Sequence, residues 1–436
     1  MSATFYDALI IGGGPGGSSA ATFLARAGQK VLVLERERVP RFHIGESLLP
    51  YNQIIFQEMG VLPALEAAGL IKKRGAQFHL ANGSKALSLV FRNGRFTREP
   101  EAFQVERATF DHVLLKHARQ SGADVREGWT VSKSSSDADG VTLHARGDEG
   151  SSEVFRGAFL IDASGRGNLT GNQERLRIVH PKLKKLAVFG HFSGVRRDEG
   201  SKGGDTVIVR LENKWFWIIP LTAEKTSVGC VMDQEEFAAS PEDPEAIFHR
   251  HWQSSLVLRE RLQKARLIGG IQTTTDFSYR NRRLVGNRLL RVGDAAGFMD
   301  PIFSAGVYLA CYSGKLAAEV VVGSLKAGDD GAARLQGYER RIRRAMRTYW
   351  NMVEGFYTTP FMEVFMNPRN RFDLPSAVTA VLAGELEGGW TIGWRMKLFF
   401  WIVKLQARWA LVPRLSFLEE PKGESQTNAE ELVFRD

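Results

Sequence analysis

The hydrophobic pattern near the N-terminus predicts a β–α–β unit. Two short apolar runs, residues 7–11 and 30–35, have the length and continuity of buried strands. A glycine-rich turn over residues 12–17 follows the first run, and the small residues of 18–27 then predict a helix. Gly28 would end this helix, because glycine readily adopts the left-handed conformation at a helix C-terminus. Strand, helix and strand in this order indicate an α/β fold.

The middle of the chain predicts a second layer of structure. Residues 107–122 have the spacing of an amphipathic helix, and residues 141–161 that of a β-meander. Residues 183–280 look like strands of a separate antiparallel layer. Its clearest strands are predicted at residues 186–192, 206–211, 215–220 and 226–231.

The last third of the chain predicts mainly helices. A buried strand over residues 288–292 leads into a long helix over residues 306–324. Beyond residue 331 the pattern is mostly helical, and the polar residues from Lys422 onward are expected to be loosely held.

Composition and charge narrow the class of protein only slightly. A chain of 436 residues is too long for one ordinary core, so two interleaved domains are expected. The net charge of +9 would suit nucleic acid, an acidic protein partner or an anionic cofactor. The basic residues are scattered and no nucleic-acid motif is present, so we expect no nucleic-acid partner.

The cysteines and the apolar runs indicate the cellular compartment in which the protein is expected. The two cysteines, Cys230 and Cys311, lie in apolar stretches, which argues against a disulfide framework and for a reducing compartment. No basic segment precedes the first apolar run, and no uncharged run reaches the roughly 18 residues of a membrane span. We therefore expect a soluble, cytoplasmic protein without a transmembrane segment, and no metal site.

The glycine-rich turn carries the first chemical signal. Gly12, Gly14 and Gly17 form G-x-G-x-x-G between a predicted strand and a predicted helix. Glycines there permit a tight turn and let a pyrophosphate approach the helix N-terminus. Glu35 ends the next strand, where its carboxylate can accept hydrogen bonds from ribose hydroxyls. These residues predict a dinucleotide site without separating NAD from FAD.

A second group of residues favours FAD. Asp162 ends the meander, Gly293 and Asp294 follow the strand over residues 288–292, and Arg107 begins a helix. FAD extends beyond its adenosine half, and an Asp at a strand end can hold ribityl hydroxyls. This distribution resembles the FAD-dependent monooxygenases of the p-hydroxybenzoate hydroxylase type. No second glycine fingerprint is present, so a separate flavin reductase is expected to supply reduced FAD.

Four further segments give a more specific resemblance. Residues 42–47, 73–76, 215–220 and 293–306 are similar to segments of flavin-dependent halogenases. The most specific motif is W-x-W-x-I-P, formed by Trp215, Trp217, Ile219 and Pro220. The resemblance is strongest to the branch that acts on phenols and pyrroles, often tethered to carrier proteins, and it runs to about residue 385.

The resemblance implies a domain organisation within the α/β fold class. An FAD-binding Rossmann-like domain would comprise residues 1–74, 98–182 and 281–330. An interleaved antiparallel β-sheet layer on the substrate side would comprise residues 75–97 and 183–280. A helical C-terminal region would occupy residues 331–436.

The resemblance also implies roles for particular residues. Trp215 and Trp217 point to one face of their predicted strand and would form a tryptophan wall between flavin and substrate. Lys73 matches the family's catalytic lysine, which binds hypohalous acid or carries its halogen. Glu46 and Ser47 are assigned to cofactor binding. Two plainer interpretations remain open, an aromatic core strand for the tryptophans and a solvated basic run for Lys73.

The start of the helix predicted at residues 306–324 is a candidate halide site. The amides of Ala305 and Gly306 would point out of the helix start, where chloride could bind, and Ser304 is a further catalytic candidate. Phe303 stands where tryptophan halogenases have a glutamate, which argues against free tryptophan as the substrate.

The resemblance implies a reaction, to which three alternatives remain. Reduced FAD, oxygen and chloride or bromide would generate hypohalous acid, which would halogenate a phenol or pyrrole, free or on an acidic carrier protein. The alternatives are a flavin-dependent hydroxylase or epoxidase, a flavin reductase of the geranylgeranyl-reductase type, and a non-catalytic flavoprotein that binds carrier proteins. Substrate identity, halide and oligomeric state stay open.

Overall fold

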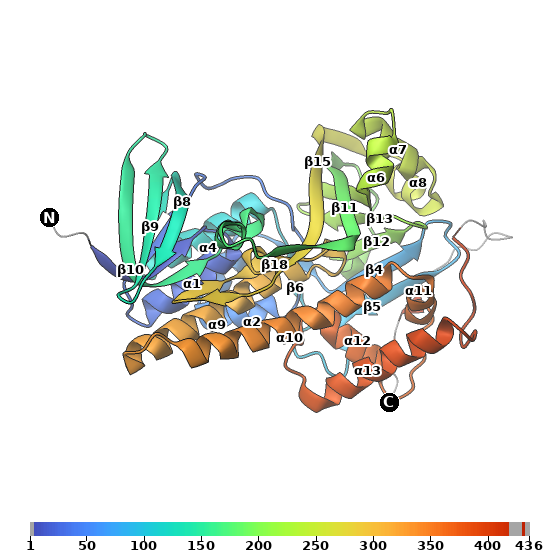
Figure 1. The fold of residues 1–436 in the computed structure, drawn as a ribbon. Coiled ribbons are helices and arrows are strands. Elements are labelled where there is room, and N and C mark those ends of the chain that lie inside the picture. Colours follow the sequence, from blue (N-terminus) through green and yellow to red (C-terminus); the bar gives the residue numbers. More distant parts are fainter. Residues whose placement is uncertain (1–3, 418–429, 432–436) are drawn as a thin grey trace.

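Two large β-sheets organise the molecule, with helices packed around and between them (Figure 1). The structure is a computed structural model that describes residues 4–417 and 430–431, except for the side chains of residues 276, 277, 430 and 431. Of the polar C-terminal tail predicted from Lys422, all but Glu430–Glu431 therefore lies outside the described residues.

The first sheet has eight strands and contains the predicted β–α–β unit. Its parallel strands are, in spatial order, β17 (Leu289–Arg291), β10 (Ser152–Asp162), β1 (Phe5–Ile11), β2 (Val31–Glu35) and β7 (Asp124–Glu127). The antiparallel strands are β16 (Val285–Gly286), β8 (Trp129–Ser136) and β9 (Val141–Gly147). Because parallel strands are covered on both faces, β1, β2 and β17 are nearly continuous apolar runs, as the sequence predicted.

Three helices pack together beside this sheet: α1 (Pro15–Arg26), α4 (Arg107–Gln120) and α9 (Ala305–Ala327). Helix α1 begins at Pro15 rather than at the predicted Ser18, since proline suits the first helical position, where the missing N–H is not needed. Helix α9 is long and apolar enough to cross a membrane, but 67% of that stretch is buried against its neighbours, as in the core helix of a globular fold.

The second sheet has nine strands. They are, in spatial order, β18 (Gly297–Phe298), β15 (Arg266–Asn281), β11 (Arg177–Ser193), β14 (Thr226–Asp233), β13 (Trp215–Pro220), β12 (Thr206–Arg210), β4 (Gly75–Leu80), β5 (Ala86–Val90) and β19 (Glu430–Glu431). The sheet is antiparallel except for the pairs β4–β12 and β5–β19, which are parallel.

The prediction of strands throughout residues 183–280 is wrong for the segment after β14. This segment forms α6 (Gln234–Ala239), α7 (Pro244–Gln253) and α8 (Leu256–Leu262). Side-chain caps begin two of these helices: Asp243 accepts a hydrogen bond from the amide of Ala246, and Ser255 accepts one from that of Leu258.

Helices complete the C-terminal region, as the sequence predicted. They are α10 (Ala332–Phe356), α11 (Thr359–Phe365), α12 (Leu374–Ala383) and α13 (Gly389–Gln406). Closer to the N-terminus, α2 (Asn52–Met59) and α3 (Leu62–Ala67) precede a two-stranded sheet of β3 (Ile71–Lys73) and β6 (Ala102–Gln104). The α/β fold class is confirmed, and the domain boundaries stay a prediction.

Candidate active site

The glycine turn between β1 and α1 is shaped to receive a ligand. A Cβ on Gly12 would lie 2.4 Å from the Ala163 carbonyl oxygen, and one on Gly17 would lie 1.9 Å from that of Gly12, so both positions require glycine. Gly14 differs, because the nearest atom to a Cβ there would be Arg41 Nη2 at 3.9 Å. The space beside Gly14 is therefore open, as the approach of a pyrophosphate requires.

Two charged side chains border this turn. Glu35, at the end of β2, accepts hydrogen bonds from the amides of Gly13 (2.6 Å) and Glu37 (2.9 Å). Arg41, which the sequence interpretation did not select, bonds to Asp111 at 3.0 Å and reaches toward Gly14. Its position directly before the segment 42–47 was the signal that could have identified it, and its guanidinium can bind a pyrophosphate.

Arg107 joins the turn to the segment of residues 42–47. It is buried in α4, forms a bidentate ion pair with Asp111 (2.8 and 2.9 Å) and donates to the Ile44 carbonyl at 2.6 Å. Burial raises the pKa of Asp111, but the positive charges of Arg107 and Arg41 lower it by more. The pKa of Asp111 therefore lies below its usual value. Burial lowers the pKa of Arg107, but Asp111, and to a smaller extent Asp294 and Glu46, raise it above its usual value.

Asp294 follows β17 in a short 3-10 helix, η4 (Gly293–Ala295). Among the described residues, no group donates a hydrogen bond to its carboxylate. Burial raises the pKa of Asp294 to about 6, against the lowering effect of Arg166 and Arg107. An unpaired carboxylate here and the open space at Gly14 are both features that FAD would use, so the residues present fit this cofactor.

Asp162 has a different environment from the one expected of a cofactor ligand. It is fully buried, and its carboxylate accepts hydrogen bonds from the amide of Ser164 and from the amide and hydroxyl of Thr170. Oδ2 therefore holds the start of α5 (Leu169–Gln173), and Oδ1 holds the turn that follows β10. The cofactor role expected of Asp162 stays a prediction, and the main chain of the next residue, Ala163, packs against Gly12.

Lys73 lies in β3 and is only 2% exposed. Its Nζ donates to Ser47 Oγ at 2.9 Å and to the Leu48 carbonyl at 3.1 Å. Burial lowers the pKa of Lys73 to about 8, although the Asp205 carboxylate acts in the opposite direction. The interpretation as a solvated basic run is wrong for Lys73, although it suits Lys72, whose side chain is 55% exposed and pairs with Glu101.

The two tryptophans lie side by side on one face of β13. Their ring centroids are 5.9 Å apart, and Trp217 donates to Ser227 Oγ at 3.0 Å. A Cβ on Gly229, in the neighbouring strand, would lie 2.2 Å from the Trp217 ring, so the ring is held tightly. Both indoles are buried, which an aromatic core strand would also show, and the tryptophan wall stays a prediction.

A chain of hydrogen bonds links Trp215 to Asp300, just before α9, and its other two members, Tyr357 and Asp300, were not selected from the sequence. Trp215 Nε1 donates to the Tyr357 hydroxyl at 2.9 Å, and that hydroxyl donates to Asp300 at 2.7 Å. Burial raises the pKa of Asp300 to about 6, although the bond from Tyr357 lowers it. Nothing in the sequence pointed to Tyr357, because it follows the end of α10 and is far along the chain from Trp215.

The helix start itself is open. Ser304 has a φ of 56°, and α9 begins at Ala305. Gly306 is exposed, with no atom within 4 Å of a Cβ placed there. Phe303 is buried against Phe356, with ring centroids 5.8 Å apart, so no carboxylate is present at this position. This arrangement leaves room for a small anion at the helix N-terminus.

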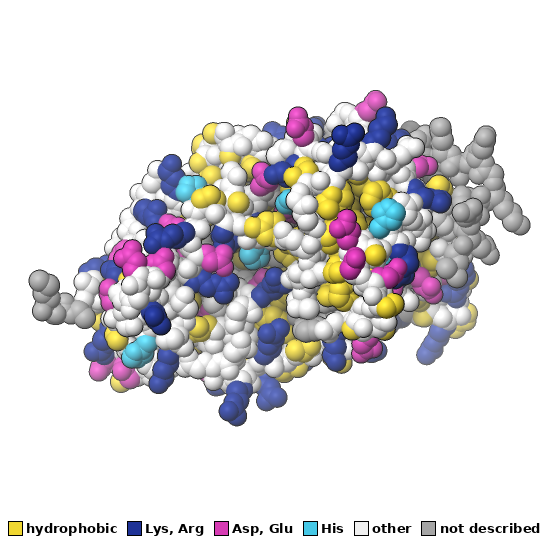
Figure 2. All heavy atoms as spheres, turned by 90° about the horizontal axis from the view of Figure 1, so that it is seen from above, with side chains coloured by type: hydrophobic (Ala, Val, Ile, Leu, Met, Phe, Trp, Pro, Cys, Tyr) yellow, Lys and Arg dark blue, Asp and Glu magenta, His cyan; other side chains and the backbone are white. Residues whose placement is uncertain are grey.

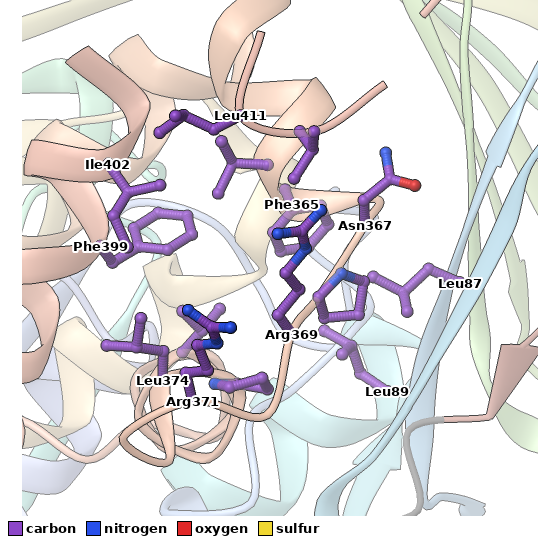
Figure 3. Close-up of a pocket in the computed structure, with 15 residues that line it drawn as sticks. Leu87, Leu89, Phe365, Asn367, Arg369, Arg371, Leu374, Phe399, Ile402 and Leu411 are labelled. Carbon is purple, nitrogen blue, oxygen red and sulfur yellow. The ribbon is translucent and has the colours of Figure 1, made fainter. Parts of the chain in front are cut away.

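An apolar pocket of about 270 Å³ lies between β5 and α11–α13 (Figure 3). Leu87 and Leu89 line it from the sheet, and Phe399 and Ile402 line it from α13. Cross-strand pairing connects Leu87 to the tryptophan wall through the successive neighbours Phe78, Ile208 and Trp217. The pocket thus shares a sheet face with the wall, about 14 Å away at three strand spacings.

Comparison with known proteins places this geometry in a family. Residues 7–91 and 92–363 match the family described as tryptophan halogenase. A 1H-pyrrole-2-carbonyl-[peptidyl-carrier protein] chlorinase of Pseudomonas fluorescens is 31% identical over 414 residues, covering 89% of this chain and 91% of that protein. A tryptophan 2-halogenase of Chondromyces crocatus is 34% identical over 355 residues, covering 80% and 67% respectively.

A solved structure agrees with these matches. The flavin-dependent brominase Bmp2 superposes with a TM-score of 0.83 at 27% identity, covering 93% of this chain and 100% of that chain. The family match extends over both the glycine turn and the W-x-W-x-I-P strand. The chain therefore belongs to the flavin-dependent halogenase family, a group of FAD-dependent oxidoreductases.

Proposed function

We propose that this protein halogenates an electron-rich aromatic ring and that Lys73 delivers the halogen. The observation that carries the proposal is the burial of Lys73, because a lysine that pairs with no carboxylate of the described residues and has a pKa of about 8 is poised for chemistry at neutral pH. The relatives act on pyrrole and tryptophan rings, which supports an aromatic substrate.

The cofactor site would hold FAD along a path of named residues. Gly14 and Arg41 would receive the pyrophosphate, Glu35 the ribose, and Asp294 the ribityl chain. When bound and reduced, FAD supplies with oxygen the oxidising equivalents that convert chloride or bromide to hypohalous acid. The amides of Ala305 and Gly306 would hold the halide. Glu46, Ser47, Arg107, Gly293 and Ser304 would support these contacts.

Trp215 and Trp217 would keep the organic substrate away from the cofactor. Two rigid, buried indoles would exclude the organic substrate and let only a small oxidant pass, so the halogen would be collected on the substrate side. The bond from Trp215 to Tyr357, and from Tyr357 to Asp300, fixes one of these rings relative to the helix start.

Lys73 would act there as a neutral amine. A neutral amine has two N–H donors, and the structure provides two acceptors, Ser47 Oγ and the Leu48 carbonyl, so its lone pair stays available. The amine takes the halogen from hypohalous acid and releases water. It then transfers the halogen to the aromatic ring, which loses its proton, and the amine is restored.

The substrate class and the partners are proposed mainly from the relatives. The substrate would be a phenol or pyrrole, and a carrier protein is a candidate partner because one relative acts on a pyrrole bound to a peptidyl carrier protein. The absence of a carboxylate at Phe303 favours rings activated by their own heteroatom over free tryptophan. A flavin reductase would supply reduced FAD, and the cytoplasm is the proposed location.

The test compares two neighbouring lysines on opposite faces of β3. Lys73→Ala should keep FAD binding, measured by flavin absorbance, while aromatic bromination falls by at least about a hundredfold because the oxidant is no longer positioned. Lys72→Ala should match the wild type. Products from phenol, pyrrole and tryptophan substrates are measured by mass spectrometry with reduced FAD, oxygen and bromide.

Other outcomes separate the alternatives. Equal loss in both lysine variants would contradict a specific role for Lys73. Oxygenated product formed without bromide would indicate a hydroxylase or epoxidase, and a saturated product formed without oxygen would indicate a reductase. Flavin that is reduced and reoxidised with no product from free or carrier-bound rings would favour a non-catalytic flavoprotein.

A further inference from the structure

The outer side of α13 combines aromatic and basic side chains. Trp390, Lys397, Trp401, Lys404 and Arg408 are exposed, with Trp390 at 81% and Trp401 at 56%. Their spacings of seven, four, three and four residues place them along one side of the helix and the turn that follows it. This row, the α13 stripe, is about 27 Å long at 1.5 Å per residue.

The α13 stripe is also a region of unbalanced charge. Residues 388–417 contain no Asp or Glu. Lys397, Lys404 and Arg408 form no ion pair within the part of the chain that the structure describes. By contrast, acidic and basic side chains are interspersed on the face shown in Figure 2. The stripe therefore favours a partner with negative charge.

The pattern of the stripe fits a protein better than a membrane. Helices that lie on membranes separate a continuous apolar face from a charged face. In α13 the inner side, with Ile392, Met396 and Phe399, is already buried against the molecule, and the outer stripe alternates tryptophans with cations. Exposed tryptophans among charged residues are typical anchors of protein interfaces.

The distance to Lys73 indicates how a substrate would arrive. Helix α13 packs on α12, and α12 packs on the short helix η1 (Phe91–Asn93). The Phe91 ring centroid lies 5.6 Å from Lys73 Nζ. Two packing distances of about 10 Å each put the helix roughly 20 Å from the lysine. A ligand docked on the stripe could reach Lys73 only through a long, extended arm.

We propose that the α13 stripe is the docking surface for an acidic carrier protein that presents an aromatic acyl group on its prosthetic arm. The proposal rests on the proposed function and adds the location and charge of the partner surface. The carrier's acidic residues would pair with Lys397, Lys404 and Arg408, and apolar hollows between them would take Trp390 and Trp401.

The test reverses the charge of the stripe and of a matched control. The stripe variant is Lys397→Glu, Lys404→Glu and Arg408→Glu. The control is Arg340→Glu, Arg344→Glu and Arg347→Glu on α10, three exposed cations that also form no ion pair within the described residues. Each protein is titrated with an acidic peptidyl carrier protein, and turnover is measured with pyrrole-2-carbonyl on that carrier and on pantetheine alone.

The expected result is selective. The stripe variant should bind the carrier at least about tenfold more weakly and lose at least tenfold in kcat/KM for the carrier-bound pyrrole. Its turnover of the pantetheine thioester should match that of the wild type, and the control should change neither value. Trp401→Ser should weaken carrier binding in the same way without changing the charge.

Three outcomes would overturn the proposal. One is equal carrier binding by wild type and stripe variant. Another is binding of the wild type, lost in the stripe variant, to phosphatidylcholine vesicles with phosphatidylserine but not to the carrier. The third is a wild-type dimer that the stripe variant converts to a monomer while carrier binding is unchanged. Because carrier binding needs no catalysis, a failure of the halogenase proposal alone would leave the binding result intact.

Discussion

At the scale of single residues, Gly14 and Gly17 lie in the same turn but are expected to have different roles. Gly14→Val should leave the fold intact, because the space around Gly14 is open, but the side chain would occupy the place of the pyrophosphate. FAD affinity, measured by fluorescence quenching, should fall by at least about tenfold with little change in Tm.

Gly17→Val is the matched control for that variant. Its Cβ would overlap the Gly12 carbonyl oxygen, so the protein should be destabilised by about 3 kcal/mol or more. Normal FAD binding by the Gly14 variant, or equal loss of Tm in both variants, would contradict the assignment of Gly14 to the cofactor.

Lys73 leads to a prediction about pH. Burial lowers its pKa from 10.5 to about 8, so the neutral fraction rises as the pH rises through 8. If the neutral amine carries the halogen, the amount of halogenated product per oxygen consumed should increase between pH 7 and 9. Dividing by oxygen consumption removes the pH dependence of the flavin steps. A ratio that is flat or falls over this range would show that the protonated lysine suffices.

Residue roles were only partly predictable from the sequence. The burial of Lys73 could not be predicted, because Lys72, Lys73 and Arg74 look alike in a sequence. Only the pleat of β3 places one of these side chains inside the protein. Asp162 was expected near the cofactor because it ends a strand, yet its carboxylate caps α5. Tyr357 and Asp300 meet only through tertiary packing.

At the scale of elements, the β13–β14 pair makes the tryptophan wall sensitive to its neighbour. Gly229→Ala should push the Trp217 indole aside, since a Cβ would lie 2.2 Å from the ring. We expect a destabilisation of about 1–3 kcal/mol in urea unfolding and a loss of halogenation with FAD binding retained.

The control is Gly270→Ala on β15 of the same sheet, where no atom lies within 4 Å of the new Cβ. It should match the wild type in both measurements. If Gly229→Ala halogenates normally despite a lowered stability, the position of Trp217 does not matter for the reaction.

Local patterns predicted elements better than their pairing. The strand over residues 215–220 was predicted with the observed bounds, and the first β–α–β unit was nearly so. The helices of residues 234–262 were missed although Asp243 and Ser255 are recognisable caps, because the apolar residues around them also suit strands. The parallel pairing of β4 with β12 joins segments more than a hundred residues apart and has no local signal.

At the scale of the whole molecule, the single glycine fingerprint in the sequence predicts that another enzyme supplies the reduced flavin. The sequence contains one G-x-G-x-x-G fingerprint, and it lies in the turn between β1 and α1. NADH or NADPH should therefore reduce the bound flavin slowly, at least about a hundredfold slower than turnover with a flavin reductase present. Stopped-flow absorbance at the flavin band makes the comparison, and rapid direct reduction would contradict it.

In the nine-stranded sheet, the central strand β13 resists sequence change, whereas β5, next to the edge strand β19, tolerates it. Trp217 is fixed by a glycine that leaves no space for even a methyl group, whereas Leu87, three strands away in the same row, borders an open cavity. Changes in side-chain volume can be accommodated beside the cavity at Leu87 but not at Trp217. Over evolutionary time, descendants of this chain should accumulate variation along β5 while β13 stays nearly invariant, so that innovation and constraint occupy different strands of one surface.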